Sequence, residues 1–197
     1  MYKRLFDILF SFLTLWIFAP FFLIICILVL FSGEGGIFFF QSRVGKDNQD
    51  FRLFKFRTMA PGSEKQGQLT VGARDSRITK VGYYLRKFKL DEVPQLINVL
   101  LGDMSVVGPR PEVRKYVNLY TPEQMRVLSV QPGITDYASL KYFNENELMG
   151  NSINPEKTYI EEIMPEKLRI NLEYVAHHSL STDLQIIAKT IGRVLGI

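Results

Sequence analysis

The hydrophobic positions of this chain divide it into two unequal parts. From Leu5 to Phe31 almost every residue is apolar, and Asp7 is the only charge. From residue 33 onward, apolar and charged residues alternate in short patterns that are typical of packed helices and strands. The pattern therefore predicts a membrane-associated segment at 1–32, followed by one folded domain at 33–197.

The apolar segment is long enough to cross a bilayer, since roughly 20 helical residues match the hydrocarbon thickness. Pro20, near its midpoint, removes a backbone hydrogen bond and kinks a helix. Basic residues flank both ends, so positive charge sets no orientation. A kinked transmembrane anchor therefore fits the sequence, and so does a helix that bends at Ala19-Pro20 and returns through the same leaflet. Asp7 is expected to pair with Lys3 or Arg4, because an unpaired carboxylate in lipid is unfavourable.

Shorter patterns in the remainder predict a small α+β domain that is mainly helical and has a short β element. The expected segments are a strand at 37–45 entering a turn at 45–48, a strand at 50–59, a loop at 60–68, helices at 78–90 and 93–100, a Pro-Gly turn at 131–136, and a helical region at 161–180 broken near Pro165. On the second strand, apolar side chains are expected to lie opposite a basic face formed by Arg52, Lys55 and Arg57. That face is either functional or simply solvated.

The final segment, 181–197, has the spacing of an amphipathic helix, with Ser181, Thr182 or Asp183 as its cap. Its apolar stripe consists of Leu184, Ile187, Ile191, Val194 and Leu195. Such a helix either lies at a membrane interface or packs on the core of its own domain.

Composition narrows the choice of partners. The formal net charge is +4, and basic residues lie on both sides of the apolar segment, which suits an anionic membrane surface or a phosphorylated ligand. These residues form no long stripe, so nucleic acid is not expected. The single cysteine, Cys26, excludes an intrachain disulfide. His177 and His178 are adjacent, which is not a ligand spacing on one helical face, so no zinc site is expected.

The stretch LDEVPQLINVLLGDMSVVGPRP, at 90–111, places two adjacent carboxylates directly before a helical pattern. Asp91 or Glu92 can cap that helix, Pro94 is tolerated only in its first turn, and Gly102 suits its C-terminal cap. Both carboxylates would lie at the positive end of the helix dipole, which stabilises their ionised forms. Capping by itself accounts for this pattern, and so does a pair of catalytic acids.

Arg110 lies between Pro109 and Pro111, which restrict the backbone on both sides of it. A guanidinium held in this way is suited to phosphate oxygens. The alternative is that Arg110 pairs with a structural carboxylate.

Several long motifs together resemble those of the bacterial sugar transferase family, in particular the small, single-domain members of its monotopic polyprenyl-phosphate phosphoglycosyl transferases. The matching stretches are KRLFD, FFFQSRVGKDNQDFRLFKFRTM, KVGYYLRKFKLDEVPQLINVLLGDMSVVGPRP, VQPGIT and LEYVAHHSLSTDLQIIAKTI. They run nearly from end to end of the chain. In that family the membrane helix is re-entrant and breaks at a proline, usually in Ser-Pro. Here Ala19-Pro20 keeps the proline, so the resemblance favours a re-entrant helix and a catalytic domain on the cytoplasmic face of the bacterial inner membrane.

The resemblance also implies an activity. It is the transfer of a sugar 1-phosphate from a UDP-sugar to undecaprenyl phosphate, with release of UMP, as the first membrane step of glycan assembly. It assigns the nucleophile to Asp91 and its acidic partner to Glu92, with Mg²⁺ as a cofactor held at this pair. The implied ligands of substrate phosphates are Arg110, Lys55, Arg57, Arg86 and Lys87. Inner-membrane lipids and downstream glycosyltransferases are the other expected partners.

One departure from the family limits what the resemblance carries over. Many members continue the PGIT motif as PGITGWAQVNGRN, whereas this chain has PGITDYASLKYFNENELM, with Asp136 in place of a glycine. The identity of the sugar therefore does not transfer, and the single-domain size favours an N-acetylated amino sugar. The alternative functions are a catalytically silent scaffold of a glycan-assembly complex and a basic module that binds membrane surfaces.

Overall fold

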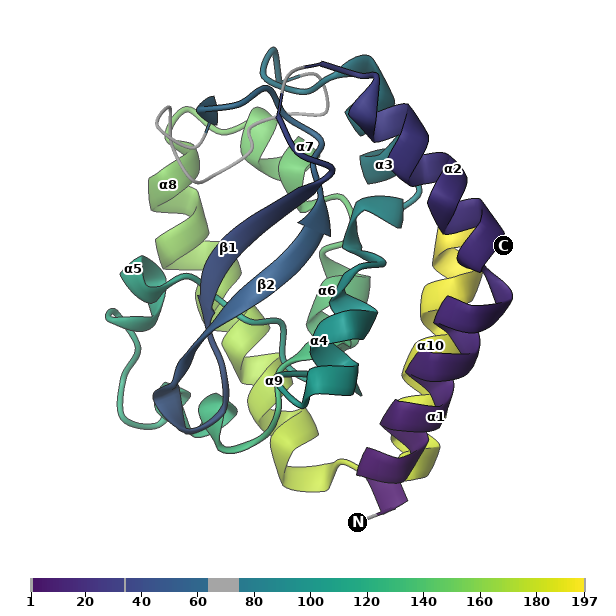
Figure 1. Cartoon of the computed structure of the whole chain (residues 1–197). Coiled ribbons are helices and arrows are strands. Elements are labelled where there is room, and N and C mark those ends of the chain that lie inside the picture. The colour runs from purple at the N-terminus through teal and green to yellow at the C-terminus, as the bar shows by residue number, and fades with distance from the viewer. Residues whose placement is uncertain (1, 34, 64–74, 197) are drawn as a thin grey trace.

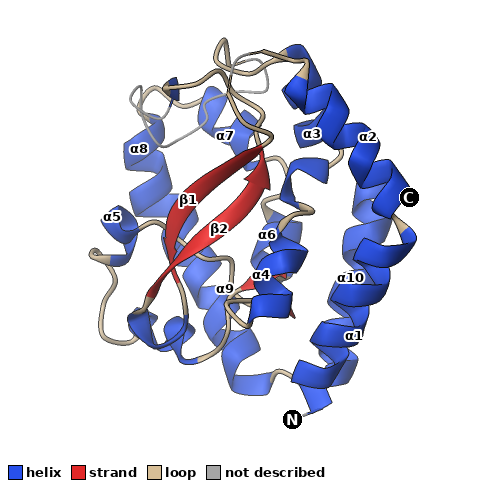
Figure 2. Cartoon of the chain, viewed as in Figure 1, coloured by secondary structure: helices blue, strands red, loops and turns tan. Residues whose placement is uncertain are grey.

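The computed structural model describes residues 2–33, 35–63 and 75–196 (Figure 1). In chain order its elements are α1 (Tyr2–Ile17), α2 (Ala19–Leu30), β1 (Phe38–Val44), η1 (Lys46–Asn48), β2 (Asp50–Phe56), α3 (Lys80–Lys87), η3 (Leu90–Glu92), α4 (Gln95–Leu101), β3 (Ser105–Val107), α5 (Arg114–Val117), η4 (Gln124–Ser129), β4 (Gly133–Thr135), α6 (Tyr137–Lys141), α7 (Glu145–Gly150), α8 (Pro155–Thr158), η5 (Tyr159–Ile163), α9 (Met164–His177) and α10 (Leu180–Leu195). Helices predominate, and the strands form two small sheets, which confirms the α+β class (Figure 2).

The N-terminal apolar segment folds as two helices rather than one. α1 and α2 meet at residue 18 with a bend of 68°, and Pro20 lies in the first turn of α2, where its missing N–H is not needed. The predicted kink at Ala19-Pro20 is confirmed. Within the described part of the chain, no unbroken helix has the length and apolarity to cross a bilayer, whereas this bent pair meets both conditions when its two limbs are taken together.

The polar residues of α1 attach it to the folded domain, and the pairing expected for Asp7 is wrong. Asp7 is buried and accepts a hydrogen bond from the Val106 N–H of β3 (3.0 Å). Lys3 instead pairs with Asp183 of α10 (2.5 Å), and Arg4 donates to backbone carbonyls at the end of α4. The expectation failed because it considered only neighbours within the segment, whereas these groups find partners in distant elements.

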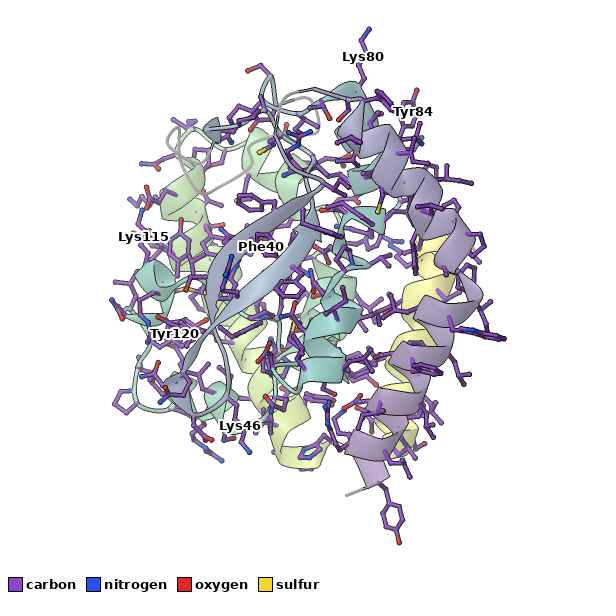
Figure 3. The ribbon with its side chains drawn as sticks, viewed as in Figure 1. Phe40, Lys46, Lys80, Tyr84, Lys115 and Tyr120 are labelled. Atoms are coloured by element: carbon purple, nitrogen blue, oxygen red, sulfur yellow. The ribbon has the colours of Figure 1, made fainter. Side chains whose placement is uncertain are left out.

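The two predicted strands pair with each other. β1 and β2 form an antiparallel hairpin in register from Phe38↔Phe56 to Val44↔Asp50, with the expected turn at 46–48 between them. In Figure 3, Phe40 lies on the front of this hairpin, where the Arg52 guanidinium stacks over its ring at 4.8 Å. β2 packs against α4, so the hairpin covers one side of the site described below.

The basic face expected on β2 does not exist. Side chains alternate with a period of two along a strand, so Leu53 and Lys55 share one face while Arg52 lies on the other. Leu53 is buried, and Lys55 is half-buried beside it. Arg57 lies beyond the end of the strand and is buried. The three basic residues therefore point to different surroundings, and only Lys55 faces the site.

The Pro-Gly turn expected at 131–136 is also wrong, because this segment enters a strand. β4 pairs in parallel with β3, with Ser105 opposite Gly133 and Val107 opposite Thr135. A side chain at Gly133 would overlap the backbone of Gly108. Gly133 thus permits the backbones of β3 and β4 to approach closely, which is a common reason for a glycine in a strand.

The helices expected at 78–90, 93–100 and 161–180 are present as α3, α4 and α9. Thr79 caps α3 through the Gly82 N–H (2.9 Å), and Gly102 ends α4 with a φ of +98°, as predicted for a C-terminal glycine. The break expected near Pro165 is not present, because the π-helical turn η5 runs directly into α9 and Pro165 lies in the first turn of α9, where its missing N–H is tolerated. In the loop expected at 60–68, residues 64–68 lie outside the described residues.

α10 begins at Leu180, ahead of the caps expected at 181–183, and does not bury its predicted stripe. Its cap is Ser179, whose hydroxyl accepts the Thr182 N–H (3.1 Å). The buried residues of this helix are Asp183 and Ile186, whereas Ile191, in the middle of the predicted stripe, is 52% exposed. The sequence left open whether this stripe lies at a membrane interface or packs on the core of the domain. The structure shows that the stripe as a whole does not pack on the core.

Buried apolar side chains connect the bent helix pair to the rest of the molecule. One cluster joins α2 to β2 and α3 through Val29, Phe56 and Leu85. A second lies between β2, α4, β3 and α10, and a third surrounds α9. At the end of α3 close to α2, Lys80 and Tyr84 project outward from the body of the molecule (Figure 3).

Candidate active site

The two adjacent carboxylates lie in the turn η3, between α3 and α4. Lys89 enters this turn in the left-handed conformation (φ +56°), and Asp91 and Glu92 are 6% and 9% exposed. α4 starts after Pro94 without a side-chain cap. The capping role considered for the two acids is therefore wrong, because they lie ahead of the first helical turn rather than at it.

Glu92 joins two basic side chains from other elements. Arg110 donates to both of its carboxylate oxygens, at 3.0 Å from Nη1 to Oε2 and through a second, shorter bond from Nη2 to Oε1. Lys55 donates to Oε1 at 2.9 Å. The structure therefore pairs Arg110 with a carboxylate, which was the alternative to phosphate binding, and that carboxylate belongs to the acidic pair itself.

The two acids have opposite electrostatic surroundings. Burial by itself would raise the pKa of Glu92, but the charges of Arg110 and Lys55 hold it well below its usual range. Burial raises the pKa of Asp91, and the charge of Lys55 opposes this rise only in part. Glu92 is thus a permanently ionised partner for the two cations, while Asp91 is a more basic carboxylate. A carboxylate with a raised pKa has the properties expected of a reactive group.

Among the described residues, no hydrogen bond to the carboxylate of Asp91 is present, although the charges of Lys55, Arg86 and Lys89 act on it. It faces a cavity of about 240 Å³. The basic residues that line this cavity include Arg43, Lys55, Arg86, Lys89 and Arg110. A buried carboxylate that faces a basic cavity can be approached by an anionic ligand, because the surrounding cations offset its own charge.

The predicted phosphate-binding residues divide into two sets. Lys55, Arg86 and Arg110 all line the cavity, and Arg86 also donates to the Thr58 hydroxyl (2.9 Å). Lys87 is exposed and does not line the cavity, since adjacent residues of a helix point about 100° apart.

Arg57 is also outside the cavity, because it holds the C-terminal end of the bent apolar helix pair. Its guanidinium donates to the carbonyls of Val29 (3.2 Å) and Gly33 (3.1 Å), close to the C-terminal end of α2. It is 7% exposed, and a side chain at Gly35 would overlap it. The structure thus gives Arg57 a role in attaching α2 to β2.

Sequence reasoning missed the far end of the cavity. There Glu112 pairs with Arg43 (3.1 Å) and accepts a hydrogen bond from the Tyr159 hydroxyl. Burial, together with the Glu112 charge, raises the pKa of Tyr159. Asn171 also lines this end, and its buried Oδ1 has no hydrogen-bond partner in the part of the chain that the structure describes. The only signal in the sequence was the position of Glu112 directly after the Pro-Arg-Pro motif.

Asp136, the residue that departs from the family pattern, supports the site from behind. It is fully buried, and its Oδ2 accepts the Arg110 backbone N–H at 2.8 Å. Its Oδ1 accepts the Ser139 N–H and caps α6. One carboxylate therefore fixes the backbone of Arg110 and the start of the following helix.

The site offers limited ligands to a divalent cation. No cluster of three or more His, Cys, Asp and Glu side chains able to hold a metal occurs in the part of the chain that the structure describes. Both oxygens of Glu92 are engaged by cations, whereas the Asp91 carboxylate remains available. Mg²⁺ is commonly bound through one or two carboxylates together with substrate phosphates. The residues present fit Mg²⁺ in that manner, with Asp91 as the protein ligand.

Fold and site together define a chain with a bent apolar helix pair and a buried acidic pair beside a basic cavity, and comparison with known proteins gives its family. The sequence profile of the family described as bacterial sugar transferase matches residues 1–196. The chain belongs to this family.

Individual relatives match over nearly the whole chain. It is 37% identical over 196 residues to a UDP-N-acetylgalactosamine-undecaprenyl-phosphate N-acetylgalactosaminephosphotransferase of Aeromonas hydrophila, with 98% of this chain and 43% of the relative covered. It is 34% identical over 209 residues to the exopolysaccharide production protein ExoY of Rhizobium meliloti, with 98% and 85% covered. A UDP-glucose:undecaprenyl-phosphate glucose-1-phosphate transferase of Klebsiella pneumoniae is 36% identical, with 96% and 39% covered. The chain thus spans less than half the length of the Aeromonas and Klebsiella relatives and most of the length of the Rhizobium relative.

Proposed function

We propose that the protein is a phosphoglycosyl transferase that moves a sugar 1-phosphate from a UDP-sugar to undecaprenyl phosphate and releases UMP. The observation that carries this proposal is the Asp91 carboxylate, which is buried, has no hydrogen-bond partner among the described residues and faces a basic cavity. Family membership supports the same reaction, since two of the relatives above are named as undecaprenyl-phosphate sugar phosphotransferases.

In the first step of the proposed mechanism, an Asp91 oxygen attacks the phosphorus that is bonded to the sugar oxygen. A new bond forms between this oxygen and phosphorus, and the bond from phosphorus to the bridging oxygen breaks. UMP leaves with the electron pair, and the sugar phosphate remains on Asp91. Covalent catalysis of this kind divides one difficult transfer into two easier ones.

In the second step, a phosphate oxygen of the lipid attacks the same phosphorus. The bond between phosphorus and Asp91 breaks, and the carboxylate is regenerated. The product is a lipid-linked diphosphosugar. No proton transfer is needed in either step, because each leaving group departs as an anion.

The other residues of the site hold charge in place during these steps. Arg110, Lys55 and Arg86 face the phosphates, and Glu92 fixes the first two of these cations through its three hydrogen bonds. Bound at Asp91, Mg²⁺ would neutralise charge on the diphosphate oxygens. Because Glu92 is paired with Arg110 and Lys55, we propose that it is a positioning residue and that Asp91 alone supplies a metal ligand.

We further propose that the protein works at the cytoplasmic face of the bacterial inner membrane, with α1 and α2 re-entering one leaflet. Exposed apolar side chains on both helices support this location, among them Trp16 (70% exposed) and Leu23 (62% exposed). The lipid acceptor carries its phosphate at the headgroup level, so a site attached to these helices lies close to it. The proposed donor is an N-acetylated amino sugar, although the named relatives include both N-acetylgalactosamine and glucose enzymes.

The test is release of UMP by the full-length protein in nanodiscs, with undecaprenyl phosphate, Mg²⁺ and a panel of UDP-sugars. We expect release with one sugar, and its loss in Asp91→Asn and in a sample without Mg²⁺. Both the variant and the wild type should associate with membranes equally. Turnover by Asp91→Asn near the wild-type rate would exclude Asp91 as nucleophile. Failure of the wild type with every donor would favour a catalytically silent scaffold.

A further inference from the structure

A second cavity, of about 270 Å³, lies directly beside the acidic pair. It is bordered by α1, η3, α4, α6 and α10. Its lining is largely apolar and includes Phe10, Leu96, Ile134, Leu140, Ile187 and Val194. This groove, which we call the apolar groove, differs sharply in character from the basic cavity that Asp91 faces.

The two cavities share one wall. Lys89, Glu92 and Arg110 line both of them, and so do Ser139 and Phe143. The ion pair between Glu92 and Arg110 therefore separates a polar chamber from an apolar one. A phosphate at the inner end of the apolar groove would meet Arg110 and Lys89 from the side opposite to the donor.

The apolar groove is not closed off from its surroundings. Two of the residues that line it are substantially exposed, namely Phe88 (46%) and Ile191 (52%). Exposed apolar residues of α1, including Leu9 (51%) and Leu13 (49%), lie on the helix that contributes Phe10 to the groove. A large exposed apolar surface of this kind indicates contact with a membrane or an apolar ligand.

We infer that the apolar groove holds the first isoprene units of the polyprenyl phosphate acceptor, with its phosphate at Arg110 and Lys89. This inference rests on the proposed function and adds the place of the acceptor to it. Charge complementarity supports this occupant, because the groove is apolar along its length and basic where it reaches the acidic pair. Donor and acceptor thus occupy different chambers, and each phosphate reaches the shared wall from its own side.

The arrangement has a consequence for the two half-reactions. Formation of the Asp91 intermediate uses the basic cavity alone, and it can be measured without lipid as exchange of labelled UMP into the UDP-sugar. Transfer to the lipid requires the apolar groove as well. A substitution that fills the groove should therefore affect the second reaction and spare the first.

The variant to test is Ile187→Trp, with Leu184→Trp as its matched control. Ile187 lines the groove and is half-buried, whereas Leu184 lies one turn earlier on α10, is 49% exposed and does not line it. We expect Ile187→Trp to raise the KM for undecaprenyl phosphate at least tenfold relative to the control, while UMP exchange changes by less than twofold. An unchanged KM, or an equal loss in both reactions by a folded protein, would overturn the inference.

A second measurement keeps the test decisive if Ile187→Trp does not fold. Val194→Trp fills the groove near the end of α10, and a polyprenyl phosphate with a diazirine in its first isoprene unit reports the site directly in the wild type. We expect crosslinks to residues that line the groove, competed by undecaprenyl phosphate. Crosslinks elsewhere, or competition by phosphatidylglycerol alone, would contradict the placement. Absence of UMP exchange in the wild type would instead count against the proposed function.

Discussion

Asp136→Asn removes one acceptor from a fully buried position behind the site. The carboxylate accepts two backbone N–H groups, from Arg110 to Oδ2 and from Ser139 to Oδ1. The asparagine amide has one acceptor oxygen, which can serve only one of these two N–H groups. Its NH₂ group would face the other N–H group, and two donors cannot form a hydrogen bond with each other. Either orientation of the amide therefore leaves one backbone donor without a partner.

The magnitude follows from the cost of such a donor. A buried polar group without its hydrogen bond costs about 1–3 kcal/mol, so we expect the free energy of unfolding to fall by about 2 kcal/mol. At about 2–4 °C per kcal/mol for a chain of this size, Tm should fall by about 4–8 °C. Because the lost partner holds the Arg110 backbone in one orientation, turnover should also fall.

The assay is thermal unfolding of the full-length protein in detergent, followed by circular dichroism. Asp47→Asn is the matched control, because Asp47 is exposed and has a φ of +53°, a conformation that asparagine also tolerates. The control should change the free energy of unfolding by less than about 0.5 kcal/mol. A Tm for Asp136→Asn equal to that of the control would refute the argument that both oxygens are needed.

Three further predictions follow from the site and the fold. In Lys55→Met, the pKa of Asp91 should rise further, because the Lys55 charge lowers it in the wild type. Since activity requires the ionised Asp91 carboxylate, the acidic limb of the pH profile of UMP exchange should move to higher pH. An acidic limb at the wild-type pH would contradict this prediction. Gly133→Ala should lower the free energy of unfolding by about 1–3 kcal/mol in denaturant, because the new methyl group overlaps the Gly108 backbone. A variant as stable as the wild type would show that β3 and β4 can separate at little cost. Pro20→Leu should straighten the 68° bend between α1 and α2 and favour a spanning helix. A tag at the N-terminus should then become accessible from the opposite face of the membrane. Unchanged accessibility of the tag would mean that tertiary contacts hold the bend.

The amino-acid sequence by itself determined those features that depend on near neighbours. The break before α2 follows from Pro20, which a helix tolerates in its first turn but not in its interior, and the end of α4 at Gly102 follows from the left-handed conformation that glycine tolerates. The hairpin of β1 and β2 and the helices α3, α4 and α9 follow from the spacing of their apolar residues. Each of these signals operates within about one helical turn or one hairpin.

Local patterns gave the wrong partners wherever a polar side chain reaches across the fold. Asp7 binds the backbone of β3 rather than its neighbours in α1, and Arg57 holds α2 rather than lining a basic face of β2. A segment taken alone cannot show these contacts, because the partner groups are supplied by elements far along the chain. α10 buries Asp183 rather than its apolar stripe for the same reason, since Lys3 of α1 provides the counter-charge.

The same distinction applies to the candidate site. The sequence placed Asp91, Glu92 and Arg110 in one short stretch and resembled a family that uses an acidic pair. Only the tertiary structure shows that Glu92 is held by Lys55, 37 positions away, and by Arg110, 18 positions away. That pairing separates the roles of two adjacent acids that look alike in the sequence. The physical reason is that charge and burial at a buried carboxylate are set by whatever packs around it, and the folded chain alone determines that packing.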